Sequence, residues 1–146
     1  MPPRFNFDYE KCKTDPSEAF PRRVTALRPI IRVKVSNKLD PSKNLKTTAL
    51  VDSGADICVF DAQIGEQIGL NIESGKLLVI NGVADKPVKA YFHDIILTVA
   101  GYDLPRYVGF SREMRSSVSG ILGQVGFFDS YKITFNYKKE KIEFSF

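Results

Sequence analysis

Asp52 stands at the end of an apolar run and is followed at once by Ser53 and Gly54. The run 47–51 has the composition of a largely buried strand, and a carboxylate beside it must be hydrogen-bonded or paired, because an isolated buried charge is very costly. The Ser53 hydroxyl can donate a hydrogen bond, and Gly54 allows the backbone to turn sharply and to approach another group closely. A carboxylate held in this way could act as a general acid or base. On the tripeptide alone, an ordinary turn is the simpler interpretation.

Other residue types that carry catalysis are scarce in this chain. There are two cysteines, Cys12 and Cys58, and a single histidine, His93. Cys58 lies in an apolar run, which indicates a small buried side chain rather than a nucleophile. His93 has no Cys or His at ligand spacing beside it, so the sequence indicates neither a zinc site nor a Cys–His pair. We expect no metal and no cofactor.

The elements that must position Asp52 are strands. Short apolar or alternating segments separated by turn signals predict a closed or sandwich-like all-β fold. The best segments are 30–35, 45–51, 77–80, 88–99, 104–110, 131–137 and 141–146. Asp61 is expected to cap a short helix over 62–68 that Gly69 ends, and one or two helical turns are expected over 124–130. The first 27 residues are polar and contain four prolines, so we divide the chain into an extension or arm (1–27) and one domain (28–146).

Two motifs in this order resemble the signatures of the retropepsin-like aspartic proteases, particularly their small microbial members. The first is Leu-Val-Asp-Ser-Gly-Ala-Asp at 50–56, and the second is Ile-Leu-Gly at 121–123, ahead of a closing hairpin. The resemblance covers roughly residues 30–146. It implies the retropepsin-like half-barrel, and an endopeptidase mechanism in which two aspartates hold a water between them.

The resemblance also implies roles for particular residues. Asp52 is the expected catalytic residue, with Ser53 and Gly54 supporting its loop and Ala55 and Asp56 lining the peptide groove. Because the chain has a single Asp-Ser-Gly, the simplest source of the second aspartate is an identical chain across a two-fold axis. We therefore expect the chain to form a homodimer and the active site to form between the two copies.

A hairpin closes over the substrate in this family, and residues 80–88 are the best match for it. Gly82 and Val83 near its turn are accordingly expected to contact substrate. Small residues there suit a mobile lid, although the same residues would also suit an ordinary hairpin.

The chain departs from the retroviral pattern at Gln124. Retroviral members usually carry an arginine there, which pairs with the acidic residue at the position of Asp56. Glutamine can donate a hydrogen bond to a carboxylate but cannot neutralise it. The alternative function left open is therefore a non-catalytic binding or assembly module that keeps the protease fold.

Composition limits the other function classes. The net charge of +4 is spread over short basic pieces without a nucleic-acid-binding motif, so we expect no nucleic-acid partner. The first residues lack an apolar signal-peptide core, and no run approaches 18 apolar residues, so no membrane span is expected. The expected location is cytoplasmic, and the expected partners are a second copy and a polypeptide substrate.

Overall fold

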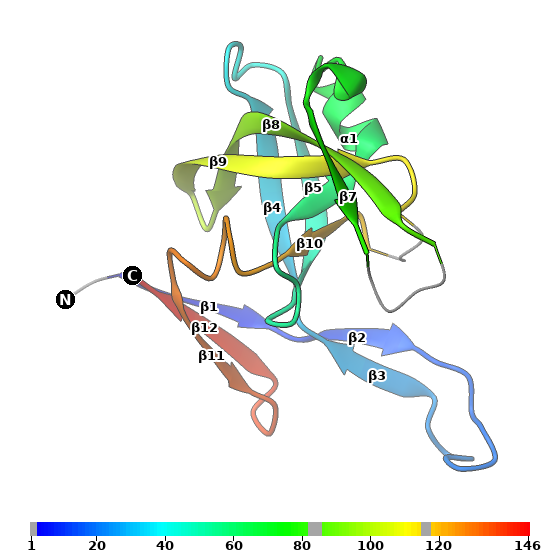
Figure 1. The fold of residues 1–146 in the computed structure, drawn as a ribbon. Helices are drawn as coiled ribbons and strands as arrows, with labels where there is room; N and C mark the ends of the chain where they lie inside the picture. Colours follow the sequence, from blue (N-terminus) through cyan, green and yellow to red (C-terminus); the bar gives the residue numbers. More distant parts are fainter. Residues whose placement is uncertain (1–2, 82–85, 115–117) are drawn as a thin grey trace.

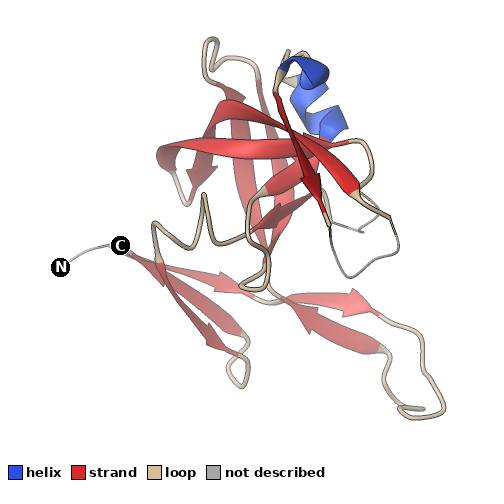
Figure 2. Cartoon of the chain, in the orientation of Figure 1, coloured by secondary structure: helices blue, strands red, loops and turns tan. Residues whose placement is uncertain are grey.

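The computed structural model describes residues 3–81, 86–114 and 118–146. These residues form a mostly β structure with one short α-helix, as Figures 1 and 2 show. The prediction of an all-β fold is confirmed.

The main sheet closes on itself in the described part of the chain. Its strand order is β4-β5-β10-β6-β9-β8-β7, and a further pairing between β4 and β8 completes a ring that leaves β7 outside. The long strand β8 makes this closure, because its first half pairs with β7 and its second half with β4. The strands are β4 (Ile30–Asn37), β5 (Asn44–Val51), β6 (Val59–Asp61), β7 (Lys76–Ile80), β8 (Val88–Val99), β9 (Tyr102–Ser111) and β10 (Gly120–Leu122).

Alternation along these strands builds the core. In β4, Ile31, Val33 and Val35 point inward and are almost fully buried, while Arg32 between them is exposed. This period-2 pattern is that of a strand with one solvated face. The largest fully buried side chains come from five different elements of the fold or the loops beside them: Phe60, Phe110, Phe127, Phe144 and Ile68.

One helix lies on the outside of the ring. Helix α1 (Ala62–Gln67) begins after Asp61, whose Oδ1 accepts a hydrogen bond from the Gln63 N–H at 2.9 Å. Gly69 follows the helix with φ of 87°, a left-handed conformation that glycine adopts without strain. The predicted cap, helix and stop signal are thus all present, and a single 3₁₀ turn, η1 (Ile72–Ser74), comes next.

The helical turns expected over 124–130 are not helical in the structure. The segment consists of successive turns, in which the N–H groups of Phe128 and Asp129 donate to the carbonyls of Gly123 and Gln124, five residues back. Gly126, with φ of 108°, lies inside the segment and interrupts a regular helix.

A second sheet joins the two ends of the chain. Strand β1 (Arg4–Asp8) pairs with β12 (Lys141–Ser145), which pairs in turn with β11 (Lys132–Asn136). The aromatic rings of Phe5, Phe7 and Tyr9 pack against the main core. No strands were expected in this extension, although Arg-Phe-Asn-Phe-Asp at 4–8 alternates between polar and apolar residues.

The rest of the extension is a two-stranded ribbon. Strands β2 (Glu10–Lys13) and β3 (Thr25–Arg28) pair with each other in antiparallel register, from Glu10 opposite Arg28 to Lys13 opposite Thr25. Figure 1 shows this ribbon leading away from the body of the molecule.

Candidate active site

Asp52 is placed by two parallel strands. Strand β10 lies beside the end of β5, with Leu122 opposite Val51. The Asp52 N–H donates to the Leu122 carbonyl at 3.0 Å, one residue beyond the end of β5. The start of the Asp52 loop (residues 52–56) is therefore fixed to the centre of the sheet.

The carboxylate of Asp52 is oriented by its own loop. Its Oδ1 accepts a hydrogen bond from the Gly54 N–H at 2.9 Å, and the Asp52 carbonyl accepts one from Ala55 at 3.2 Å. A Cβ at Gly54 would lie 3.3 Å from that same Oδ1, which is tighter than most such contacts. Asp52 is half-buried, while Ser53 and Gly54 are exposed. The carboxylate is thus held in place yet accessible.

The second motif crosses directly behind this loop. The N–H groups of Gln124 and Val125 donate to the carbonyls of Ala55 and Asp56 at 2.8 and 2.9 Å. A Cβ on Gly123 would lie 2.2 Å from the Ile57 carbonyl oxygen, far inside contact distance. The two backbones can come this close only because residue 123 has no side chain.

Gln124 also supports the loop through its side chain. Its Nε2 donates to the Ser53 carbonyl at 2.9 Å. Within the described residues, Asp56 makes no ion pair and the Ser53 hydroxyl has no hydrogen-bond partner. The neutral amide therefore bonds to the loop backbone rather than to the Asp56 carboxylate.

Cys58 fills the space beneath the crossing. It is fully buried, and its Sγ accepts a hydrogen bond from the Gly123 N–H at 3.3 Å. Burial raises the pKa of the Cys58 thiol to about 11. At neutral pH the thiol is therefore protonated and a poor nucleophile, and the prediction of a small buried side chain is confirmed.

A cavity of about 490 Å³ opens between the Asp52 loop and β7. Ala55 and Asp56, two of the residues expected to bind substrate, line it beside Gly54. Gly82 and Val83, the other two, lie outside the described residues. The roles of all these residues, and of Asp52, Ser53 and Gly54, remain predictions.

The apolar walls of this cavity were not expected from the sequence to belong to the site. They come from the segment just after the Asp52 loop and from β6, β7 and β10: Ile57, Val59, Leu78, Val79, Ile80 and Ile121. A smaller hollow of about 320 Å³ shares Ile57 and Leu78 with it. The available signal in the sequence is the uninterrupted apolar run 77–80. In the structure, Leu77, Leu78 and Val79 of this run are 44–51% exposed.

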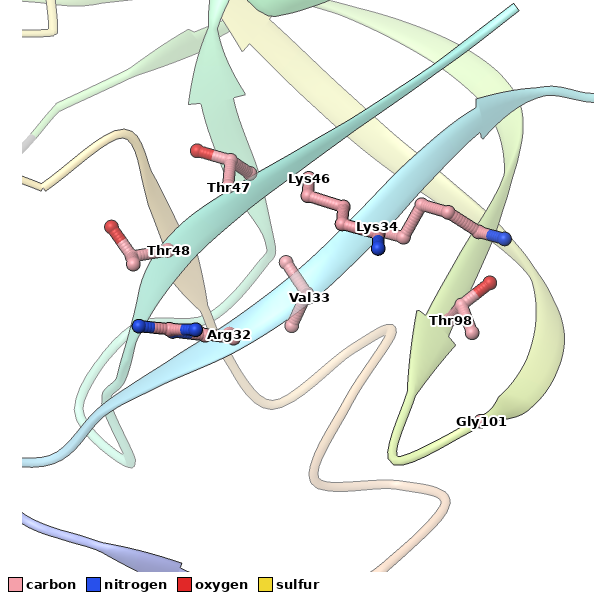
Figure 3. Close-up of a pocket in the computed structure, with 8 residues that line it drawn as sticks. All are labelled: Arg32, Val33, Lys34, Lys46, Thr47, Thr48, Thr98 and Gly101. Atoms are coloured by element: carbon pink, nitrogen blue, oxygen red, sulfur yellow. The ribbon is translucent and has the colours of Figure 1, made fainter. Parts of the chain in front are cut away.

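A hollow of about 560 Å³ lies elsewhere, on the outer face of β4 and β5. Figure 3 shows Arg32, Lys34 and Lys46 around it, and Lys34 lies directly opposite Lys46 in the strand register. None of its lining residues was expected in the site. Since it holds no carboxylate, it offers no acid–base chemistry of the kind that Asp52 could perform.

The described residues contain no group of three or more His, Cys, Asp or Glu side chains that could hold a metal ion. None of the helices found in them is long and apolar enough to cross a membrane.

Comparisons with known proteins agree with this geometry. A family profile described as retroviral aspartyl protease matches residues 25–67, which include the whole Asp52 loop. No match was found among curated protein sequences.

Several solved structures are similar to this chain. A retropepsin-like aspartic protease from Rickettsia conorii aligns over 100% of this chain and 94% of its own, with a TM-score of 0.58 and 12% identity. EIAV protease complexed with the inhibitor HBY-793 aligns over 66% and 82%, with a TM-score of 0.46 and 17% identity. The retroviral protease-like domain of Ddi1 from Leishmania major aligns over 75% and 82%, with a TM-score of 0.49 and 17% identity.

The fold is that of the retropepsin-like aspartic proteases, and the resemblance read from the two motifs is confirmed. At these identities the structural likeness establishes the fold and leaves the activity to be argued from the site.

Proposed function

We propose that two copies of this chain form an aspartic endopeptidase, with one Asp52 from each copy in a shared active site. The observation that carries the proposal is the placement of Asp52. The residue is half-buried, its backbone N–H donates to the Leu122 carbonyl, and its carboxylate accepts a hydrogen bond from the Gly54 N–H. The loop that carries it lines an open cavity with apolar walls.

Two carboxylates at close range divide the chemistry between them. One takes a proton from a water molecule as that water attacks the peptide carbonyl, and the other, protonated, donates a hydrogen bond to the carbonyl oxygen. Close like charges disfavour double ionisation, so a pair of this kind shares one proton. Neither role requires a metal or a cofactor.

The cavity suits an extended polypeptide substrate. Its walls are apolar side chains on either side of the Asp52 loop, which favour apolar side chains of the substrate. Strand β7 pairs with β8 along one edge only, within the described residues, so its other edge offers backbone groups to an extended peptide.

The test is cleavage by Asp52→Asn. Asparagine keeps the size of the side chain but cannot accept and return the proton, so we expect peptide-library cleavage to fall by about 10³-fold or more. Far-UV circular dichroism and sedimentation should be unchanged. Asp103→Asn is the matched control, because Asp103 is exposed and bonds to Thr98 away from the cavity.

Cleavage by Asp52→Asn within about tenfold of wild type would contradict a general acid–base role for this residue. Peptide binding without any cleavage by the wild-type dimer would instead favour a binding module that keeps the protease fold.

A further inference from the structure

From here on, the arm means the two-stranded ribbon of residues 10–28, the part of the extension that follows β1. Strands β2 and β3 pair with each other and, among the described residues, with no other strand. No residue of the arm belongs to either hydrophobic cluster, whereas Phe5, Phe7 and Tyr9 just before it pack on the core. Ala26 is the one buried side chain of the arm, so the arm buries little apolar surface in its own copy.

The arm exposes apolar surface at its tip. Every residue from 15 to 25 is exposed, including Phe20 at 63% and Val24 at 56%. An isolated two-stranded ribbon is at best marginally stable in water. Contact of Phe20 and Val24 with another surface would remove this apolar area from water and stabilise the ribbon.

The root of the arm is tied to the Asp52 loop. The Val51 N–H donates to the Pro29 carbonyl at 2.8 Å, so the residue after β3 is bonded to the residue before Asp52. On the other strand, the Tyr9 N–H donates to the Glu140 carbonyl at 3.0 Å. Figure 1 shows the arm leaving the body from this root.

The position of the arm beside the Asp52 loop favours a second copy of the chain as its partner. In the proposed function, a second Asp52 must come close enough to share a water with the first, so the second copy must approach past the root of the arm. The arm of the same copy does not occupy the cavity beside the Asp52 loop, since none of its residues lines that cavity.

We propose that each arm clasps the other copy beside the paired Asp52 loops and buries Phe20 and Val24 against it. The inference rests on the proposed function, because the half-site is incomplete without the second copy. Two-fold symmetry makes the contact reciprocal, so each dimer contains two clasps.

The test is sedimentation equilibrium on the double variant Phe20→Ser with Val24→Ser. Loss of buried aromatic and aliphatic anchors should raise the dimer Kd by about tenfold or more. Leu39→Ser is the matched control: Leu39 is 95% exposed in the β4–β5 turn, at the opposite end of β4 from Pro29. Its Kd should equal that of wild type, and an unchanged Kd in the double variant would overturn the clasp.

Hydrogen exchange supplies a second measurement on the wild-type chain. Amides of the arm should exchange more slowly above the dimer Kd than below it, because the partner covers them. Equal exchange at both concentrations would overturn the clasp without reference to any variant.

Cleavage assays on the same samples separate this inference from the proposed function. The double variant should cleave like wild type once its concentration is raised far above its Kd. Faster cleavage per chain by the double variant would indicate that the arm blocks the substrate cavity in the wild type, which would overturn the clasp. If the dimer forms and cleaves without the arm contacts, the clasp is contradicted and the proposed function stands. If dimerisation depends on the arm but no peptide is cleaved, the proposed function is contradicted and the clasp stands.

Discussion

At the scale of single residues, Gln124 holds the Asp52 loop without adding charge to it. Its Nε2 bonds to the Ser53 carbonyl, while its own N–H bonds to the Ala55 carbonyl. Both bonds act on the loop that orients the Asp52 carboxylate. An arginine at this position could pair with Asp56, but the observed amide instead fixes the backbone next to the carboxylate.

We predict that Gln124→Ala lowers cleavage by about three- to tenfold, the effect of losing one ordinary hydrogen bond. The backbone bond to Ala55 persists in this variant, so the fold should be retained. Gln63→Ala, an exposed glutamine on α1, is the matched control and should cleave like wild type. If both variants cleave equally, the bond to Ser53 does not orient the site.

At the scale of elements, the site depends on the crossing of two segments. Strand β5 delivers the Asp52 loop, and β10 delivers residues 123–125 behind it, at parallel register. The crossing is made of backbone hydrogen bonds over the buried Cys58 thiol. Because the atoms that approach Gly123 belong to the backbone, they cannot move aside as a flexible side chain would.

Gly123→Ala should therefore destabilise the chain by about 2–3 kcal/mol or more, measured as the free energy of unfolding in urea. The new Cβ would fall 2.2 Å from the Ile57 carbonyl oxygen and 2.6 Å from that of Ala55. Gly101→Ala is the comparison: nothing lies within 4 Å of its Cβ, and its φ of 83° should cost only about 1 kcal/mol. Equal losses of unfolding free energy in the two variants would show that the backbones at the crossing can move apart to accept a side chain at residue 123.

At the scale of the whole molecule, each chain carries one Asp-Ser-Gly, so the proposed two-aspartate site requires a second copy. The arm begins next to the Asp52 loop, because the Val51 N–H donates to the Pro29 carbonyl. Strands β5 and β10 of the closed sheet hold the start of this loop.

Mixing the wild-type chain with a ninefold excess of Asp52→Asn should reduce cleavage per wild-type chain by about tenfold, because random pairing leaves few sites with two aspartates. The measurement is the initial rate after subunit exchange at fixed wild-type concentration. Adding the same excess of Asp103→Asn should raise the rate instead, since those chains remain active. Cleavage unaffected by Asp52→Asn would show that one chain is sufficient.

Much of the fold could be predicted from local patterns. Strand alternation, the Asp61 cap and the Gly69 stop each depend on residues near in sequence, and all are present. The turns over 124–130 were predicted as helical because their composition allows a helix, but Gly126 and the bonds to residues five positions back gave another conformation. Residues 1–27 are expected to form an extension or arm because of their prolines and polar residues, and this composition conceals the pairing of β2 with β3.

Residue types and local spacing are enough to predict an all-β chain with Asp52 in a strand-terminal loop and a glycine motif about 70 residues later. They do not predict that Gly123 crosses behind Asp52, that Gln124 bonds to Ser53, or that apolar residues of β6, β7 and β10 wall the cavity. Those contacts join segments far apart in the chain, and their partners are chosen by how the closed sheet packs rather than by any local pattern.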